Sequence, residues 1–288
     1  MAFSDNIRTY FEGTWHNGNV PIMRSADHGA WLGSTVFDGA RLFEGLTPDL
    51  MAHCQRINRS AEALGITPNH TAQQIFDIVK EGLKLFEKGA AVYIRPMYWG
   101  IDSGLAGIVP MEDVTGFCVC LEEAPMAAAT ATTTLTTTQF HRPVLADSVC
   151  NAKAGALYPN NARMLKEAAS KGFGNALVAD ALGNVAESAS ANVFMARDGE
   201  IFTPAANGTF LAGITRARHI KNLRAAGKTV HEAVLSFDDF RQADEVFLSG
   251  NMSKITPVTA FDSVNYQHGP ITKLARDLYW DWALSAKD

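Results

Sequence analysis

The chain has 288 residues, 47% hydrophobic and 19% charged, a composition typical of a globular protein with room for two modest cores. A formal net charge of -5 and the lack of a basic run argue against a nucleic-acid binder, although local anion sites stay open. The four cysteines are too few for a disulfide framework, and neither they nor the eight histidines have metal-site spacing. We therefore expect buried thiols and no metal.

The first ten residues are polar, without the apolar stretch of a secretory signal. No segment approaches the roughly 20 apolar residues that span a bilayer. We expect a cytoplasmic protein that has no membrane partner.

The first part of the chain predicts a small α+β domain over residues 1–121. Apolar residues recur at helical spacing from Ile75 to Phe86, and Gly89 supplies a stop signal. Residues 91–98 and 115–121 are predicted strands. In the first of these, Tyr93 and Arg95 are two residues apart, so their side chains should face the same side.

A stretch with two glutamates, a proline and many Ala and Thr residues predicts an exposed crossing at 122–131, before a larger domain over 132–288. In that domain the patterns predict three strands and three helices, and turn signals at 182–184 and 197–200 bracket the strand at 191–196. The predicted strands are 132–140, 175–179 and 191–196, and the predicted helices are 161–170, one opening near Thr215, and 272–284.

Several common enzyme motifs are missing. There is no Gly-x-Ser-x-Gly elbow and no Walker-type Gly-Lys-Ser/Thr, and Gly172-Phe173-Gly174 lacks the third glycine of a dinucleotide fingerprint. What remains is a set of local clusters in the second half of the chain.

Two of these clusters centre on a charged residue. Lys153 stands among small residues in 151–155, so it is either exposed or has a depressed pKa that makes it a nucleophile towards an aldehyde. Glu187 lies among Ala and Ser in 183–194, just before a predicted strand. It is either a solvated carboxylate beside a hairpin or the partner of a buried cation such as a protonated pyridine.

The other two clusters suit an anion. Gly213-Ile214-Thr215 opens a helix, which is the arrangement that binds phosphate, or it is a simple helix N-cap. Leu248 to Ser253 form a small polar loop that could offer backbone donors, or merely a turn.

In their order along the chain, these clusters resemble the fold-type-IV pyridoxal-phosphate enzymes. Residues 32–41 are similar to that family's early glycine-phenylalanine-acid-glycine-arginine segment, and residues 53–57 to its phosphate-arginine motif. The separation of Lys153 from Glu187 and the run Tyr93-Ile94-Arg95-Pro96 resemble the branched-chain aminotransferases most.

The resemblance implies an α+β fold, with a small α/β domain and a larger β-barrel-like domain with helices, and pyridoxal 5'-phosphate as the cofactor. Lys153 would hold the cofactor as a Schiff base and move the proton during catalysis. Glu187 would keep the pyridine nitrogen protonated, Tyr158 would bond the phenolic oxygen, and Arg56 would bind the phosphate. The other implied cofactor contacts are Asn192, Ile214, Thr215, Gly250 and Asn251.

For the substrate, the resemblance implies that Tyr93 and Arg95 receive a carboxylate. The implied walls around the substrate are Leu32, Phe37, Trp99 and Met252. Three features depart from the branched-chain pattern: Leu32 replaces a tyrosine, residues 251–254 replace threonine-alanine-alanine-glutamate, and residues 97–100 are bulkier.

We therefore expect an aminotransferase that moves the amino group of an aliphatic, branched-chain type L-amino acid to 2-oxoglutarate by ping-pong turnover. The resemblance also implies a homodimer with shared active sites. The altered loop and Leu32 keep an (R)-amine or D-amino-acid transaminase open. An aminodeoxychorismate-lyase-type enzyme and a non-catalytic protein of the same fold are the remaining alternatives.

Overall fold

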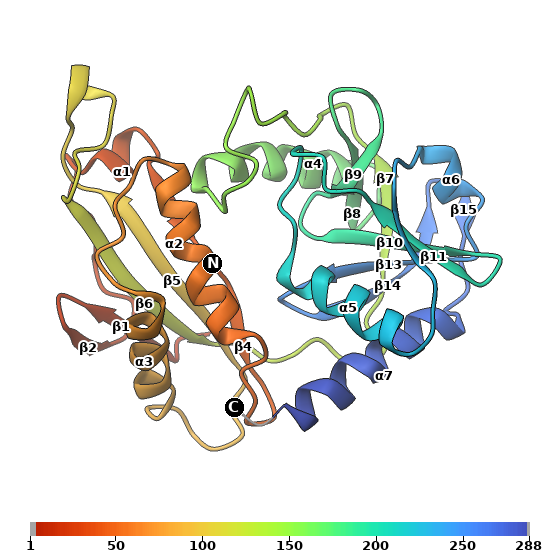
Figure 1. The fold of residues 1–288 in the computed structure, drawn as a ribbon, viewed down its shortest axis with the longest axis horizontal. Coiled ribbons are helices and arrows are strands. Elements are labelled where there is room, and N and C mark those ends of the chain that lie inside the picture. Colours follow the sequence, from red (N-terminus) through yellow and green to blue (C-terminus); the bar gives the residue numbers. More distant parts are fainter. Residues whose placement is uncertain (1–3, 287–288) are drawn as a thin grey trace. The chain divides into compact units, whose positions relative to one another are not determined.

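The computed structural model describes residues 4–286 and divides into two compact units (Figure 1). The first unit contains residues 4–126 and 152–157, and the second contains 127–151 and 158–286. The division after Met126 falls inside the predicted crossing at 122–131. The segment around Lys153, predicted as part of the second domain, lies in the first unit instead.

The first unit is built on a six-stranded antiparallel sheet in the order β2-β1-β6-β5-β3, with β4 also beside β5. Its strands are β1 (Ile7–Phe11), β2 (Thr14–Asn17), β3 (Thr35–Phe37), β4 (Ala40–Leu42), β5 (Val92–Gly100) and β6 (Thr115–Glu123). Its helices are α1 (His28–Trp31), α2 (Leu50–Ala63) and α3 (Ala72–Leu83), with short 3-10 turns η1 (Leu105–Gly107) and η2 (Gly155–Leu157).

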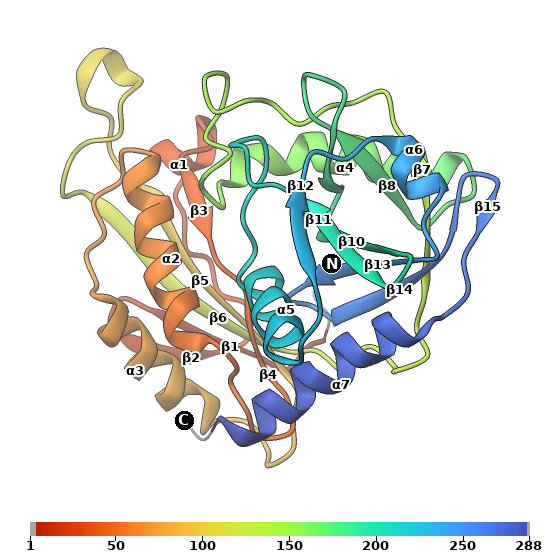
Figure 2. The same cartoon turned by 45° about the vertical axis from the view of Figure 1, so that its right-hand side comes forward.

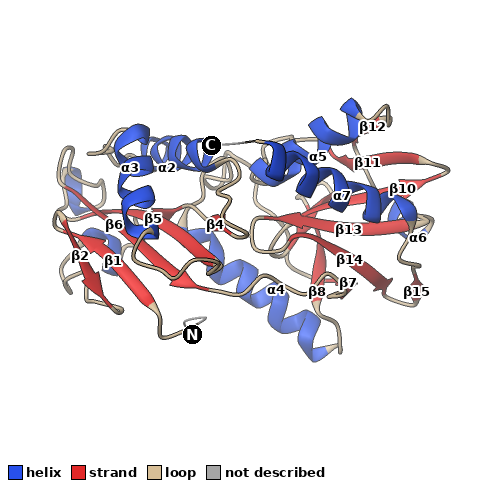
Figure 3. Ribbon diagram, turned by 90° about the horizontal axis from the view of Figure 1, so that it is seen from below, coloured by secondary structure: helices blue, strands red, loops and turns tan. Residues whose placement is uncertain are grey.

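Helices α2 and α3 cover one face of this sheet (Figure 3). A Cβ on Gly82 of α3 would lie 2.7 Å from Leu121 of β6, whose register partner on β5 is the buried Ile94. Because side chains alternate along a strand, Tyr93 and Arg95 point to the opposite face, where both are half-buried. The two residues therefore share a face, as their spacing predicted.

The second unit is built on a nine-stranded mixed sheet in the order β12-β11-β10-β13-β14-β7-β8-β9, with β15 beside β14. The strands are β7 (Thr133–Thr137), β8 (Asn175–Ala179), β9 (Val185–Ser188), β10 (Asn192–Arg197), β11 (Glu200–Pro204), β12 (Val230–Ala233), β13 (Glu245–Gly250), β14 (Lys254–Phe261) and β15 (Val264–Asn265). Val185 of β9 donates its N–H to the carbonyl of Leu235, just after β12, at 2.7 Å. This bond joins the two ends of the strand order, so the sheet curls almost closed.

Alternating side chains form two apolar layers on this curled sheet. Val193 and Val246 belong to the layer that also contains Phe240, whereas Phe194 and Phe247 belong to the layer that packs on α5 and α7. Helices α5 and α7 lie side by side (Figure 2). The helices of this unit are α4 (Tyr158–Ser170), α5 (Ile214–Ala225), α6 (Phe237–Arg241) and α7 (Pro270–Ser285).

The strongly patterned elements lie where the sequence predicted them, among them α3, α4, α5, α7, β5, β6, β8 and β10. Other details differ. Glu187 precedes the predicted strand that is β10, but it lies within β9, which had not been predicted, and β13 takes Leu248 to Gly250 out of the predicted polar loop. Helix α2, which carries Arg56, had not been predicted.

The buried carboxylate of Glu245 caps the N-terminus of α7. It accepts the N–H of Ile271 at 3.0 Å, and the N–H and hydroxyl of Thr272 at 2.8 and 2.7 Å. A Cβ on the N-cap residue Gly269 would lie 2.2 Å from this carboxylate, so the close approach requires glycine. One strand side chain thereby satisfies backbone donors that the helix itself leaves without acceptors.

We expect Glu245→Ala to lower the free energy of unfolding by about 3 kcal/mol, since it removes charged hydrogen bonds and leaves buried N–H groups unsatisfied. Urea unfolding at neutral pH measures this change. Glu200→Ala, which removes an exposed partner of His231, is the control and should cost less than about 1 kcal/mol. Equal losses in the two variants would contradict the capping role.

Candidate active site

Within residues 4–286, no group of three or more His, Cys, Asp and Glu side chains could hold a metal ion. No helix in the same part of the chain is long and apolar enough to cross a membrane. The candidate site residues fall into one group in each unit.

In the first unit, the backbone of Lys153 is fixed between α2 and β3. Its N–H donates to the hydroxyl of Ser60 at 3.1 Å, and its carbonyl accepts the N–H of Phe37 at 3.1 Å. The Nζ atom lies 4.9 Å from the centre of the Phe37 ring. Lys153 therefore has a defined place on the same unit as Phe37 and Arg56, and it is half-buried rather than fully exposed.

Arg56 on α2 is held by a fully buried carboxylate. Its Nε donates to Asp38 Oδ2 at 2.7 Å and its Nη2 to Asp38 Oδ1 at 2.9 Å, a two-pronged pair, while His53 Nδ1 lies 2.7 Å from the same Oδ1. Burial alone would raise the pKa of Asp38, but the Arg56 guanidinium and then His53 outweigh it and hold the pKa well below its usual range. Asp38 thus stays ionised and orients the arginine.

Tyr93 and Arg95 form a polar patch on β5. The Arg95 guanidinium lies 5.5 Å from the centre of the Tyr93 ring, and its Nη2 lies 3.4 Å from Glu122 and 3.3 Å from the Cys120 sulfur. A Cβ on Gly39 would lie 2.5 Å from the Tyr93 hydroxyl, so the tyrosine needs a glycine there.

The other predicted wall residues of this unit differ in exposure. Leu32 follows α1 and is 41% exposed, whereas Trp99 is 1% exposed. The Trp99 indole N–H donates to Asp27 at 3.2 Å. A Cβ on Gly116 would lie 2.1 Å from the Trp99 ring, so the ring packs directly against this glycine. Trp99 is therefore part of the packed interior of the first unit, and its role as a substrate wall stays a prediction.

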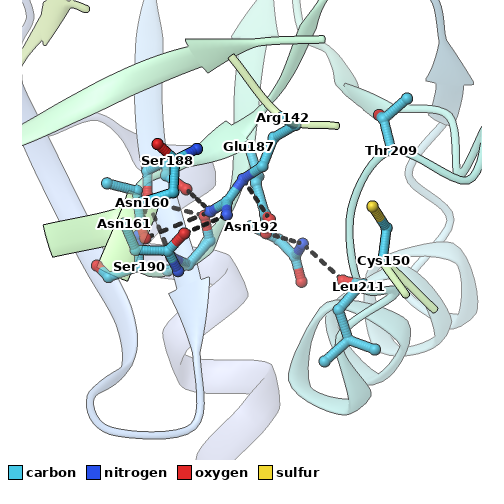
Figure 4. Close-up of polar contacts among 12 residues, drawn as sticks. Arg142, Cys150, Asn160, Asn161, Glu187, Ser188, Ser190, Asn192, Thr209 and Leu211 are labelled. Atoms are coloured by element: carbon cyan, nitrogen blue, oxygen red, sulfur yellow. Dashed lines mark hydrogen bonds and ion pairs between the residues drawn. The ribbon is translucent and has the colours of Figure 1, made fainter. Parts of the chain in front are cut away.

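In the second unit, Glu187 is buried and held on both oxygens (Figure 4). Its Oε1 lies 3.1 Å from Arg142 Nε, and its Oε2 accepts from Asn192 Nδ2 at 3.1 Å. Arg142 also donates to the carbonyls of Ser188 and Ala189 at 3.1 and 3.3 Å, and to the side chain of Asn161. The solvated alternative for Glu187 is therefore wrong.

Helix α5 begins next to this carboxylate network. Asn192 also donates to the carbonyl of Leu211 at 3.2 Å, and a Cβ on Gly213 would lie 2.1 Å from its Oδ1. Gly213 is the N-cap of α5, as the simple N-cap alternative states, and no side-chain cap hydrogen bond is made there. The first turn, with Ile214 and the buried Thr215, offers the backbone N–H donors and positive dipole end that bind anions.

Ser249 near the end of β13 and Asn251 in the turn that follows add two more donors. The Ser249 hydroxyl and the Asn251 amide nitrogen Nδ2 are buried and have no hydrogen-bond partner among the described residues. Ser249 is the register partner of Asn192, which places it beside the network. Buried polar groups normally have partners, so these two atoms indicate a ligand with acceptor oxygens. Gly250 and Met252 lie on either side of Asn251.

Tyr158 is the first residue of α4 and is 38% exposed. Sequence reasoning missed three supporting residues: Arg142, Asp38 and His53. The spacing of His53 and Arg56, three apart and hence on one face of α2, was a usable local signal. Nothing local marked Arg142, which meets Ser188 and Ala189 only through the fold.

The sequence profile of the family described as amino-transferase class IV matches residues 35–261. The chain belongs to this family.

Relatives of this aminotransferase support the same placement. A solved aminotransferase from Brucella abortus, described as bound to the cofactor PLP, is 54% identical, with a TM-score of 0.95 over 96% of this chain and 99% of that one. The branched-chain-amino-acid aminotransferase of Salmonella typhimurium is 28% identical, covering 92% of this chain and 88% of its own. The solved branched-chain enzyme of Escherichia coli is 25% identical, with a TM-score of 0.88 over 98% of this chain and 96% of that one. The predicted two-domain α+β class of fold type IV is confirmed.

We expect Asp38→Asn to destabilise this aminotransferase at neutral pH by about 3–5 kcal/mol, since it leaves Arg56 without its buried anion. Because the folded pKa of Asp38 is lowered, its stabilisation is fully present above the unfolded pKa of about 3.9 and is lost as pH falls through the folded pKa. The difference between wild type and variant should therefore shrink below about pH 4.

Denaturant unfolding at several pH values measures this difference. Asp77→Asn, on the exposed side of α3, is the matched control and should change stability little at any pH. A difference for Asp38→Asn that stays constant down to pH 3 would rule out the ionised pair.

Proposed function

We propose that this enzyme transfers the amino group of aliphatic, branched-chain type L-amino acids to 2-oxoglutarate in two successive half-reactions. It is a pyridoxal 5'-phosphate-dependent transaminase of the branched-chain kind at the level of the family. The substrate pair, the ping-pong order and the roles of single residues are our proposal. The observation that carries it is the buried carboxylate of Glu187, balanced by Arg142 and lying next to the N-terminus of α5.

The second unit fits the two ends of the cofactor. Glu187 offers a fixed anionic acceptor for the pyridine N–H, and Asn192 keeps that carboxylate in place. The first turn of α5, Ser249 and Asn251 offer donors for a phosphate. We assign Ile214, Thr215 and Gly250 to the same phosphate site, and Tyr158 to the phenolic oxygen. When bound, the cofactor supplies the electron sink that makes the substrate α-carbon acidic.

The first unit supplies the remaining groups of the proposal. The Lys153 Nζ atom would hold the cofactor aldehyde covalently, and after the substrate amine replaces it, would carry the proton between the substrate α-carbon and the cofactor. Arg56, oriented by Asp38, would bind the phosphate with a second donor pair. A lysine is suited to the proton transfer because its amine can be both nucleophile and base.

Substrate selection is assigned to the patch on β5. The Arg95 guanidinium would receive a carboxylate with help from the Tyr93 hydroxyl, and Phe37 would give an apolar contact. The 3.4 Å contact of Arg95 with Glu122 is longer than a good charged hydrogen bond, so a substrate carboxylate can compete for this cation. Leu32, Trp99 and Met252 remain assigned to the walls. A homodimer with shared active sites and a cytoplasmic location rest on resemblance and composition alone.

The experiment that tests the proposal is a half-reaction of the yellow holoprotein without an acceptor. L-leucine, L-glutamate, D-alanine and (R)-1-phenylethylamine are added separately while the cofactor absorbance is followed. We expect rapid bleaching by the two L-amino acids only, since the proposal assigns L-amino acids as donors and Tyr93 and Arg95 to the substrate carboxylate, which the (R)-amine lacks. Lys153→Ala should not bleach and should hold the cofactor without a covalent bond, and the exposed-lysine control Lys166→Ala should behave as wild type.

Bleaching only by the (R)-amine or by D-alanine would replace the proposal with the second kind of transaminase and point to Leu32 and residues 251–254. Full turnover by Lys153→Ala would overturn the assignment of the lysine.

We expect Glu187→Gln to bind the cofactor but to slow the half-reaction by roughly tenfold to a hundredfold, because the pyridine nitrogen loses its anionic partner. Stopped-flow absorbance measures the rate, and urea unfolding checks that the fold survives. Glu200→Gln is the control for loss of a surface charge. An unchanged rate would show that another carboxylate serves the ring.

A further inference from the structure

Lys254 is fully buried and is the first residue of β14, directly after the turn that contains Asn251. Burying an ammonium group is costly unless it has close polar partners. Its backbone also adopts a left-handed conformation, with φ of +64°, which is unfavourable for a lysine. Two costs at one position call for a compensating role.

The Nζ atom of Lys254 donates to Asn251 Oδ1 at 2.6 Å. A lysine ammonium has only donors, whereas an asparagine side chain has one acceptor oxygen and one donor nitrogen. The carbonyl end of Asn251 must therefore face Lys254, and the Nδ2 end must point away from it. That Nδ2 is the buried donor that lacks a partner among the described residues.

The backbone of Lys254 is tied to helix α5. His219 of α5 is fully buried, and its Nε2 lies 3.1 Å from the carbonyl oxygen of Lys254, to which it must donate. Burial lowers the pKa of His219 to about 4, so the imidazole is neutral at physiological pH. The ring of Tyr279 on α7 lies 5.8 Å from the lysine nitrogen and completes the enclosure. The lysine therefore has a fixed position relative to the helix whose first turn offers anion donors.

We propose that Lys254 is a positioning residue: by holding Oδ1 of Asn251, it presents Nδ2 of Asn251 to the cofactor phosphate. The inference rests on the proposed function, because the phosphate is that of pyridoxal 5'-phosphate. Lys254 itself does not touch the reacting atoms. Without it, the amide of Asn251 is free to turn its oxygen towards the phosphate, which repels it.

The test compares affinities of the full-length apoprotein for pyridoxal 5'-phosphate and for pyridoxal, which lacks the phosphate. We expect Lys254→Met to weaken binding of the phosphorylated form roughly tenfold to a hundredfold and to leave pyridoxal binding unchanged. Asn251→Ala should give a similar selective loss. The double variant should lose no more than Asn251→Ala alone, because the lysine acts only through the asparagine. Lys273→Met, on the exposed side of α7, is the matched control.

Equal weakening of both ligands by Lys254→Met, or full additivity in the double variant, would show a merely structural lysine and overturn the inference. If Lys254→Met does not fold, Asn251→Asp keeps the contact with Lys254 but removes the donor. It should then lose affinity for the phosphorylated form alone, and wild-type affinity would overturn the inference. A wild-type protein that never turns yellow with pyridoxal 5'-phosphate would instead refute the proposed function.

Discussion

The ion pair between Arg142 and Glu187 is the interaction on which the proposed cofactor site depends. A buried carboxylate without a cation would take up a proton, and a neutral acid cannot keep a pyridine nitrogen charged. Arg142 prevents this, and the carbonyls of Ser188 and Ala189 fix the arginine in turn. The charge of Glu187 is thus balanced by the protein itself. A ligand that approaches it needs one N–H donor, and no rearrangement of charge is required.

The first unit uses the same pairing with the roles exchanged. Asp38 is fully buried and supports Arg56, which is proposed to meet the ligand. In the second unit Arg142 is the support, and Glu187 is proposed to meet the ligand. Asp38, the supporting residue of the first pair, is fully buried. Arg142, the supporting residue of the second pair, donates to backbone carbonyls. His53 adds a second bond to Asp38, as Asn192 does to Glu187. Each unit therefore preorganises one charged group with a buried partner and one further hydrogen bond.

The sequence predicted the periodic elements better than the residues that support the proposed site. Helix α3 has a clear apolar spacing and a capping box at Thr71, whereas α2 begins after Asp49 in a left-handed conformation and has no side-chain cap. Strand β9 has only four residues, too few for a pattern. Arg142 could not be found from sequence, since its partners lie tens of residues away. Local motifs also could not tell that Lys153 belongs with the first unit.

The departure of residues 251–254 from the branched-chain pattern concerns the cofactor more than the substrate. An asparagine in place of threonine keeps one hydrogen-bond donor, provided that its amide has a fixed orientation, and Lys254 supplies that condition. A lysine in place of glutamate also changes the local charge from negative to positive, which favours a bound phosphate. Both changes act on the same anion. We therefore assign substrate preference to the β5 face with Tyr93 and Arg95, where the sequence resembles the branched-chain pattern.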